Sequence, residues 1–190
     1  MGWLLNNARA LALGCLATLV AACTTTTITP QYANPPERKY DMAAVGEVTA
    51  TDKLWDGLIP YFRRGFRDQL SKDNSVASVS EDPPAAPVGA SMLVVVGTIT
   101  EIDRGNAAAR FIIGLGAGRA IARGTFEIRD GDGTVLAKFE SRKSYSGGAG
   151  IGGADMVSME ELVQQLGAET ANVVARWMKG QRLDATSSPQ

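Results

Sequence analysis

One glycine-rich stretch of this sequence has the residue types of a phosphate-binding loop. Residues 111–124 read FIIGLGAGRAIARG, with glycines at positions 114, 116 and 118 and arginines on both sides. Glycine lets backbone N–H groups approach phosphate oxygens, but a dinucleotide-binding loop must also lead into a helix whose N-terminus meets the anion. The alternating residues that follow predict a strand, and an arginine and an alanine stand where a Walker-type loop needs a lysine and a hydroxyl. We therefore do not expect a nucleotide to bind here.

Two interpretations of this stretch stay open. The first is a glycine-permitted turn or bulge between two strands. The second is an exposed loop that contacts a partner protein or lipid headgroups, because its apolar side chains are flanked by arginines. The candidate interaction loop consists of Arg110, Phe111, Ile112, Ile113, Gly114, Gly116, Gly118 and Arg119.

Composition restricts the other chemistry that the chain can perform. It has no histidine, so a Ser-His-Asp apparatus cannot form and the commonest metal ligand is missing. Its two cysteines, Cys15 and Cys23, leave no thiol in the later chain for a disulfide, a zinc finger or a nucleophile. Carboxylates such as Asp103, Asp130 and Asp155 are not paired by their spacing for acid–base work. We expect no catalytic residues and no cofactor.

An acidic turn, DGDG at residues 130–133, begins like a calcium-binding loop. Such a loop needs a glycine at its sixth position and a glutamate at its twelfth, and these places hold Val135 and Ser141. We therefore expect no metal site.

The first residues resemble a bacterial lipoprotein signal peptide. Arg9 precedes an apolar run that is too short for a lasting membrane helix, and small residues lead to Cys23. Residues 20–23, VAAC, resemble a lipobox, in which the cysteine receives a lipid and becomes the mature N-terminus. Cys15 is a rival with too short an apolar run before it, and an ordinary cleaved signal is the other alternative. The residue after Cys23 is Thr24 rather than an inner-membrane retention aspartate, which favours the periplasmic face of the outer membrane.

The rest of the chain is expected to form one domain. With 19 cationic and 20 anionic residues, the chain lacks the basic excess of a nucleic-acid-binding protein. Residues 1–22 are predicted to be the signal peptide, residues 23–40 a flexible tether rich in threonine and proline, and residues 184–190 a disordered tail. The folded domain is expected over residues 41–183.

Periodicity predicts an α+β domain. Strands are expected over residues 42–50, 75–80 and 91–103, with Val45 and Val48 in the core, and residues 120–142 should form a β-hairpin. Its alternation predicts a buried side of Ala122, Gly124, Phe126, Ile128, Val135, Ala137 and Phe139, and an outer side that includes Arg123, Glu127, Arg129, Lys138, Glu140 and Arg142. One amphipathic helix is expected over residues 51–73, kinked or properly starting at Pro60, and another after Ser158, which fits a capping box with Glu161. This order implies a mixed, mostly antiparallel sheet with two helices packed on one face.

Several of these features together resemble a known family. Gly105, Arg110, the three alternating glycines, the turn at residues 130–133 and a second glycine cluster at residues 147–153 resemble a bacterial envelope family catalogued as domain of unknown function 4410. The resemblance covers residues 45–179 and implies a lipoprotein without an assigned activity. The element order also resembles the domain of the curli secretion lipoprotein, the N-terminal domain of TolB and the lipoprotein activators of penicillin-binding proteins, which are peptidoglycan synthases.

Two functions are therefore expected. The first is a non-enzymatic, lipid-anchored envelope lipoprotein that binds an envelope protein partner or supports an assembly. The alternative is an oligomeric secretion or channel component of the outer membrane.

Overall fold

The computed structural model describes residues 24–33, 36, 39–83, 91–105, 120–145, 157–181 and 183. The elements follow one another as β1 (Thr24–Ala33), β2 (Met42–Ala50), the 3-10 helix η1 (Lys53–Leu58), α2 (Ile59–Asp73), β3 (Ser78–Ser80), β4 (Met92–Asp103), β5 (Ala120–Asp130), β6 (Val135–Tyr145) and α4 (Met159–Met178).

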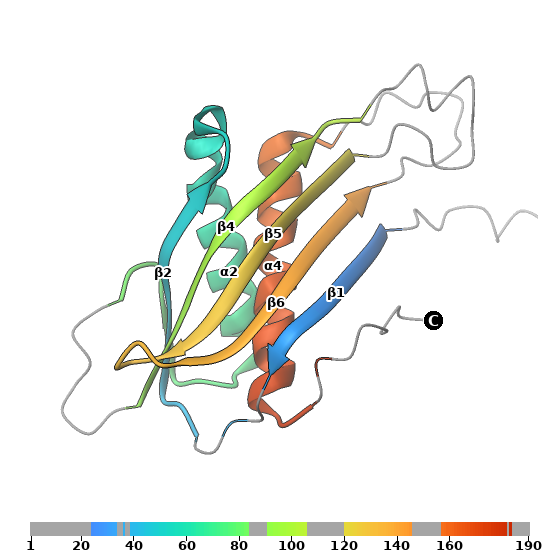
Figure 1. Ribbon diagram of the computed structural model, residues 1–190. Coiled ribbons are helices and arrows are strands. Elements are labelled where there is room, and N and C mark those ends of the chain that lie inside the picture. The colour runs from blue at the N-terminus through green and yellow to red at the C-terminus, as the bar shows by residue number, and fades with distance from the viewer. Residues whose placement is uncertain are drawn as a thin grey trace, which may run out of the picture.

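The strands form one six-stranded sheet in the order β1-β6-β5-β4-β2-β3. Pairs β1–β6, β6–β5 and β5–β4 are antiparallel, while β4–β2 and β2–β3 are parallel. Helices α2 and α4 lie side by side on one face of this sheet, and the other face is open (Figure 1). The predicted α+β architecture, a mostly antiparallel mixed sheet with two helices on one face, is confirmed.

The core lies between the sheet and the two helices. Alternate residues of the hairpin, including Ala122, Phe126 and Phe139, point inward and are fully buried. The ring of Phe62 on α2 stacks on Phe126 with centroids 5.0 Å apart. Trp177 on α4 is also buried and lies 6.2 Å from the Tyr40 ring. Burial of these aromatic rings joins both helices to the sheet.

Phe126 fits under the sheet because two neighbouring positions are glycine. A Cβ atom at Gly97 would lie 2.3 Å from the Phe126 ring, and one at Gly124 would lie 2.6 Å from it. Real Cβ atoms do not approach a neighbour so closely, so the ring occupies the space that two side chains would take.

A bulge in β2 explains why Val45 and Val48 are both buried despite a spacing of three. Val45 pairs with Val95 and Val48 with Gly97, so two residues of β2 lie opposite one residue of β4. Arg63 on α2 donates to two carbonyl oxygens at the bulge, from Nη1 to Val45 at 3.0 Å and from Nη2 to Gly46 at 2.8 Å. The guanidinium group therefore satisfies backbone acceptors where the strand pairing is irregular.

The helix starts follow the local chemistry. The 3-10 helix η1 begins after Asp52, whose carboxylate accepts from the Leu54 N–H at 2.9 Å, and regular α2 begins at Ile59 with Pro60 in its first turn. Of the two possibilities predicted for Pro60, a kink or the start of the regular helix, the second is thus correct. Ser158 caps α4 as expected, because its hydroxyl accepts from the Glu161 N–H at 3.1 Å.

Three predictions need correction. The flexible tether expected over residues 23–40 is wrong for residues 24–33, which form edge strand β1; their run of β-branched threonines and an isoleucine has high strand propensity. The strand expected over residues 75–80 is limited to Ser78–Ser80. Val135, expected on the buried side of the hairpin, is 39% exposed because the register shifts beside the turn.

Candidate functional site

The most distinctive surface is the open face of the sheet, opposite the helices. Strands alternate their side chains between the two faces, so the residues between the core positions point outward. We call this surface the open face; its outward residues include Glu47 and Thr49 of β2, Val96 and Thr98 of β4, Arg123, Thr125, Glu127 and Arg129 of β5, and Lys138, Glu140 and Arg142 of β6.

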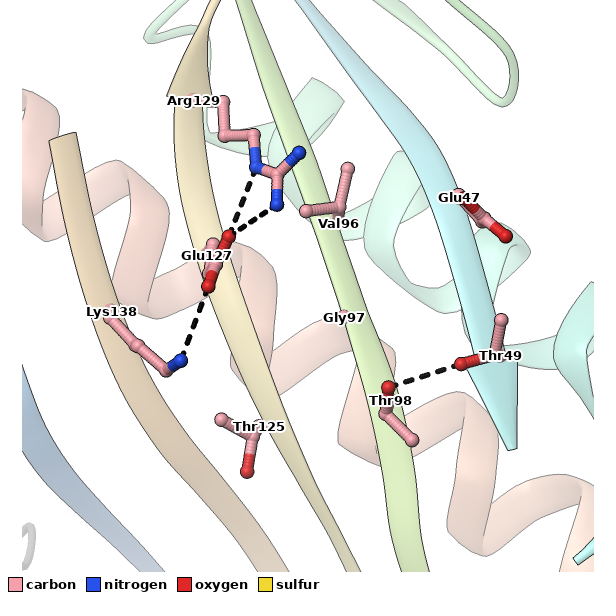
Figure 2. A pocket seen from close by; sticks show the side chains of 9 residues that line it. All are labelled: Glu47, Thr49, Val96, Gly97, Thr98, Thr125, Glu127, Arg129 and Lys138. Carbon is pink, nitrogen blue, oxygen red and sulfur yellow. Dashed lines mark hydrogen bonds and ion pairs between the residues drawn. The ribbon is translucent and has the colours of Figure 1, made fainter. Parts of the chain in front are cut away.

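A shallow hollow of about 370 Å³ lies in the middle of the open face. Figure 2 shows its lining, which comes from four strands and combines three threonines, one valine and charged residues of both signs. The residues are Glu47, Thr49, Val96, Gly97, Thr98, Thr125, Glu127, Arg129 and Lys138.

Glu127 is the charged residue of the hollow that other side chains hold in place by hydrogen bonds. Its Oε2 accepts from Arg129 Nε at 3.0 Å and from Arg129 Nη2 at 2.5 Å, and its Oε1 accepts from Lys138 Nζ at 3.2 Å (Figure 2). Hydrogen bonds from Arg129 lower the pKa of Glu127 most, and Lys138 adds to this against the opposing effect of partial burial. Glu127 is therefore held ionised at neutral pH.

The bulge in β2 determines which side chains line the nearest side of the hollow. Because two residues of β2 face Val96, Glu47 points outward and is exposed at the rim. Below it, the hydroxyl groups of Thr49 and Thr98 are hydrogen-bonded at 3.0 Å (Figure 2). Within the described part of the chain, no ion pair involves Glu47.

A second group of charges lies further along β5 and β6. Arg123 Nε is 3.4 Å from Glu101 Oε2 and 3.6 Å from Glu140 Oε1. Arg142 lies directly opposite Arg123 in the strand register. Among the described residues Arg142 has no ion-pair partner, and its buried Nε has no hydrogen bond. Like charges at opposed positions repel each other, so the strand register does not neutralise Arg142.

Glu127 is poorly suited to transfer protons at neutral pH. A general acid or base works best with a pKa near the ambient pH, whereas the pKa of Glu127 is lowered away from it. Of the residues that the structure describes, no three Asp, Glu, His or Cys side chains are grouped to hold a metal ion. No helix among them is long and apolar enough to cross a membrane.

The site residues predicted from the sequence lie outside the described residues. This holds for the lipidation candidate Cys23 and for the whole candidate interaction loop, residues 110–119, so both stay predictions. The structure does place the residues that flank the loop: Gly105 has φ of +70°, its N–H donates to Asp103 Oδ1 at 2.8 Å, and Ala120 is buried. In the acidic turn, Asp130 accepts from the Gly131 N–H at 2.6 Å and Asp132 from the Thr134 N–H at 2.9 Å, so both carboxylates stabilise the turn.

The hollow was not predicted as a site from the sequence. The alternation did place Glu127, Arg129 and Lys138 on the outer side of the hairpin, but only the strand register shows that Glu127 and Lys138 are directly opposed. Opposite charges at opposed positions of a predicted hairpin are the signal from which this pair could have been found.

The resemblance expected from the sequence is confirmed over part of the chain. Residues 61–149 match a family model described as "Domain of unknown function (DUF4410)", a shorter span than the expected residues 45–179. No curated protein matches this chain in sequence.

Solved structures of PelC dodecamers from Paraburkholderia phytofirmans have a similar fold. One shares 16% sequence identity with a TM-score of 0.50, and a single-substitution variant shares 14% with a TM-score of 0.49; each comparison covers 84% of this chain and 99% of the PelC chain. At 16% sequence identity, the similarity to the first of these structures shows a shared fold and nothing more.

Proposed function

We propose that this protein is a non-enzymatic, lipid-anchored lipoprotein of the bacterial cell envelope that docks a protein partner on its open face. The observation that carries the proposal is a charge at each of the two sides of the open face that has no ion-pair partner among the residues that the structure describes. Glu47 lies on β2 and Arg142 on β6, three strand spacings away across the sheet. Glu47 is level with Lys138, and Arg142 is four residues further along β6, so the two charges are roughly 20 Å apart. A partner with a basic group and an acidic group at that separation would be held in one orientation.

The surface between these charges supports docking. Val96, Thr98 and Thr125 form its uncharged middle, and the charged residues surround it. Protein interfaces commonly have such a centre with a polar rim. Strands β2, β4, β5 and β6 together present roughly 600 Å², which approaches the ~800 Å² that one partner contributes to a standard interface.

The charges of the hollow favour a binding role over an enzymatic one. Arg129 and Lys138 already neutralise Glu127, so these three residues form a stable network. An acidic or basic group in such a network is a poor proton carrier at neutral pH.

The location belongs to the same proposal. Cys23 would carry the lipid, and palmitate among its acyl chains would hold the domain at the periplasmic face of the outer membrane. Several chains anchor firmly, since each buried methylene adds about 0.8 kcal/mol of membrane affinity.

Site-specific photo-cross-linking in the native host tests the docking surface. A benzophenone amino acid at Thr125, inside the hollow, should give a discrete protein adduct. The matched control is the same amino acid at Gln165, which lies half-exposed on α4 in the helix layer. Adducts of equal yield from both positions, or none from Thr125 in a folded and membrane-bound protein, would contradict docking on the open face.

A second candidate function is self-assembly into a ring as part of an outer-membrane secretion or channel complex. It is favoured by the similarity to the PelC dodecamer, which extends over 99% of that chain. Light scattering of the detergent-extracted protein should then give a multimer of defined size, and a strictly monomeric mass would remove this candidate.

A further inference from the structure

One end of the sheet gathers several strand ends. Thr24 at the start of β1 pairs with Tyr145 at the end of β6, and Tyr145 also pairs with Ala120 at the start of β5. Asp103 at the end of β4 pairs with Ile121. In Figure 1 this end is uppermost. We call it the β1-start end; the turn between β5 and β6 lies at the opposite end.

The start of β1 leaves no room for a spacer after the proposed lipid-bearing residue. Cys23 directly precedes Thr24, so their Cα atoms are about 3.8 Å apart. Because Thr24 is already paired in the sheet, the lipid would attach to the folded domain itself. The β1-start end would then be held against the bilayer surface.

An exposed apolar side chain marks the same end independently. Leu54 in η1 is 86% exposed, and the only other large exposed hydrophobic residue in the described part of the chain is Val135, at 39%. The 3-10 helix η1 lies at the β1-start end (Figure 1), whereas Val135 begins β6 beside the turn at the opposite end. An exposed leucine is stabilised by contact with the acyl boundary of a membrane.

The polar groups at this end carry charges of both signs, as zwitterionic headgroups do. Lys53 and Arg104 are exposed cations and Asp56 in η1 is an exposed anion, while the carboxylates of Asp52 and Asp103 accept from the backbone N–H groups of Leu54 and Gly105. Arg104 also lies near the start of α4: the pKa of Glu160 is lowered first by its own backbone N–H, then by the Ser158 hydroxyl and the charge of Arg104. The N-terminus of α4 therefore belongs to this end as well.

We infer that the β1-start end is a membrane-contacting surface, on which Leu54 enters the headgroup region while the hairpin turn points away from the bilayer. This inference rests on the proposed lipid anchor at Cys23. With 11 residues in β5, the turn would stand about 35 Å further from the membrane. The open face would then be roughly perpendicular to the bilayer and accessible to a partner from the side.

Fluorescence depth measurements on the lipidated protein test the orientation. Cys15 leaves with the signal peptide and Cys23 is blocked by its lipid, so a single introduced cysteine is a unique labelling site. The variants are Leu54→Cys and, as the matched control, Val135→Cys, each labelled with an environment-sensitive dye and bound to phosphatidylcholine vesicles. We expect several-fold stronger quenching of the Leu54 label by lipid-borne nitroxides, and stronger quenching of the Val135 label by aqueous iodide.

The outcomes separate the orientation from the anchor. If the lipidated protein floats with the vesicles and both labels are quenched equally, or the Val135 label is quenched more by the lipid probe, the orientation is wrong while the anchor stands. If the protein does not float, the anchor and the orientation that rests on it both fail. A second measurement uses the protein prepared with one acyl chain instead of several, because one chain gives weak and reversible membrane binding. Leu54→Asp should reduce the affinity of this protein for vesicles, while Val135→Asp should leave it unchanged.

Discussion

Arg63 Nη2 on α2 donates to the carbonyl oxygen of Gly46 at 2.8 Å, across the boundary between the helix layer and the sheet. Together with the bond to Val45, this contact holds the bulge that directs Glu47 to the open face. One guanidinium in the helix layer therefore shapes the rim of the hollow on the opposite face.

Replacing Arg63 should destabilise the fold and loosen this rim. Arg63→Met removes the donors to three carbonyl oxygens, those of Val45, Gly46 and Glu81, and the ion pair with Asp82, so we expect a loss of about 2 kcal/mol in the free energy of unfolding. Urea denaturation measures the change. Arg64→Met is the control, because Arg64 is exposed on the same helix, with its guanidinium over the face of the Tyr61 ring at 5.8 Å. Equal losses in both variants would show that the bulge does not depend on Arg63.

Phe126 should not tolerate a side chain at its neighbouring glycines. In Gly97→Ala the new Cβ would lie 2.3 Å from the ring and 2.5 Å from the Thr125 carbonyl oxygen, so we expect a loss of about 2 kcal/mol from overpacking. Gly57→Ala is the control, since nothing lies within 4 Å of its Cβ position. Thermal unfolding should show a lower Tm for Gly97→Ala and an equal or higher Tm for Gly57→Ala; an unchanged Tm for the first would mean that the ring can move aside.

Glu127 should make the stability of the protein depend on pH. Its pKa is lower in the folded state than in the unfolded state, so it adds stability above the ordinary glutamate value of about 4.3, and this contribution disappears as the pH falls through the folded-state value. The free-energy difference between wild type and Glu127→Gln should be at most about 1 kcal/mol near neutral pH and should vanish in acid.

Denaturation curves measured between neutral and acidic pH provide this difference. The control places Glu127→Gln in a background of Arg129→Gln and Lys138→Gln, where the carboxylate has lost its two cations. The pH dependence should be much smaller there. A pH dependence of the same size in both backgrounds would mean that it does not come from the interaction of Glu127 with Arg129 and Lys138.

The lipid anchor should depend on Cys23 alone. Cys23→Ala should abolish incorporation of an alkyne-labelled palmitate and release the protein from the membrane fraction, because several acyl chains are needed for firm anchoring. Cys15→Ala should change neither result, since Cys15 would be removed with the signal peptide. Loss of labelling in Cys15→Ala with retention in Cys23→Ala would reverse the assignment.

The sequence predicts those parts of the fold that follow local periodicity. Alternation between Ala122 and Ile128, and again at Ala137 and Phe139, is sufficient to identify the hairpin and its buried side. Helix α4 was predictable because Ser158 and Glu161 form a recognisable cap ahead of an apolar stripe.

Features that depend on distant residues were not predictable. The bulge beside Gly46 is stabilised by Arg63, and no local pattern connects these two positions. The edge strand β1 is polar, so its hydrophobic pattern is weak, and its pairing partner β6 lies more than 100 residues further along the chain. The hollow, likewise, exists only once four separate strands are assembled in register.

The most direct test of docking on the open face is the yield of the Thr125 cross-link in two charge-reversal variants. Arg142→Glu places a carboxylate opposite Arg123, which should preserve or improve the fold while removing the cation offered to the partner. Lys72→Glu makes the same change in charge on the exposed side of α2. Docking on the open face predicts that the adduct is lost in Arg142→Glu and retained in Lys72→Glu; equal yields in the two folded variants would contradict it.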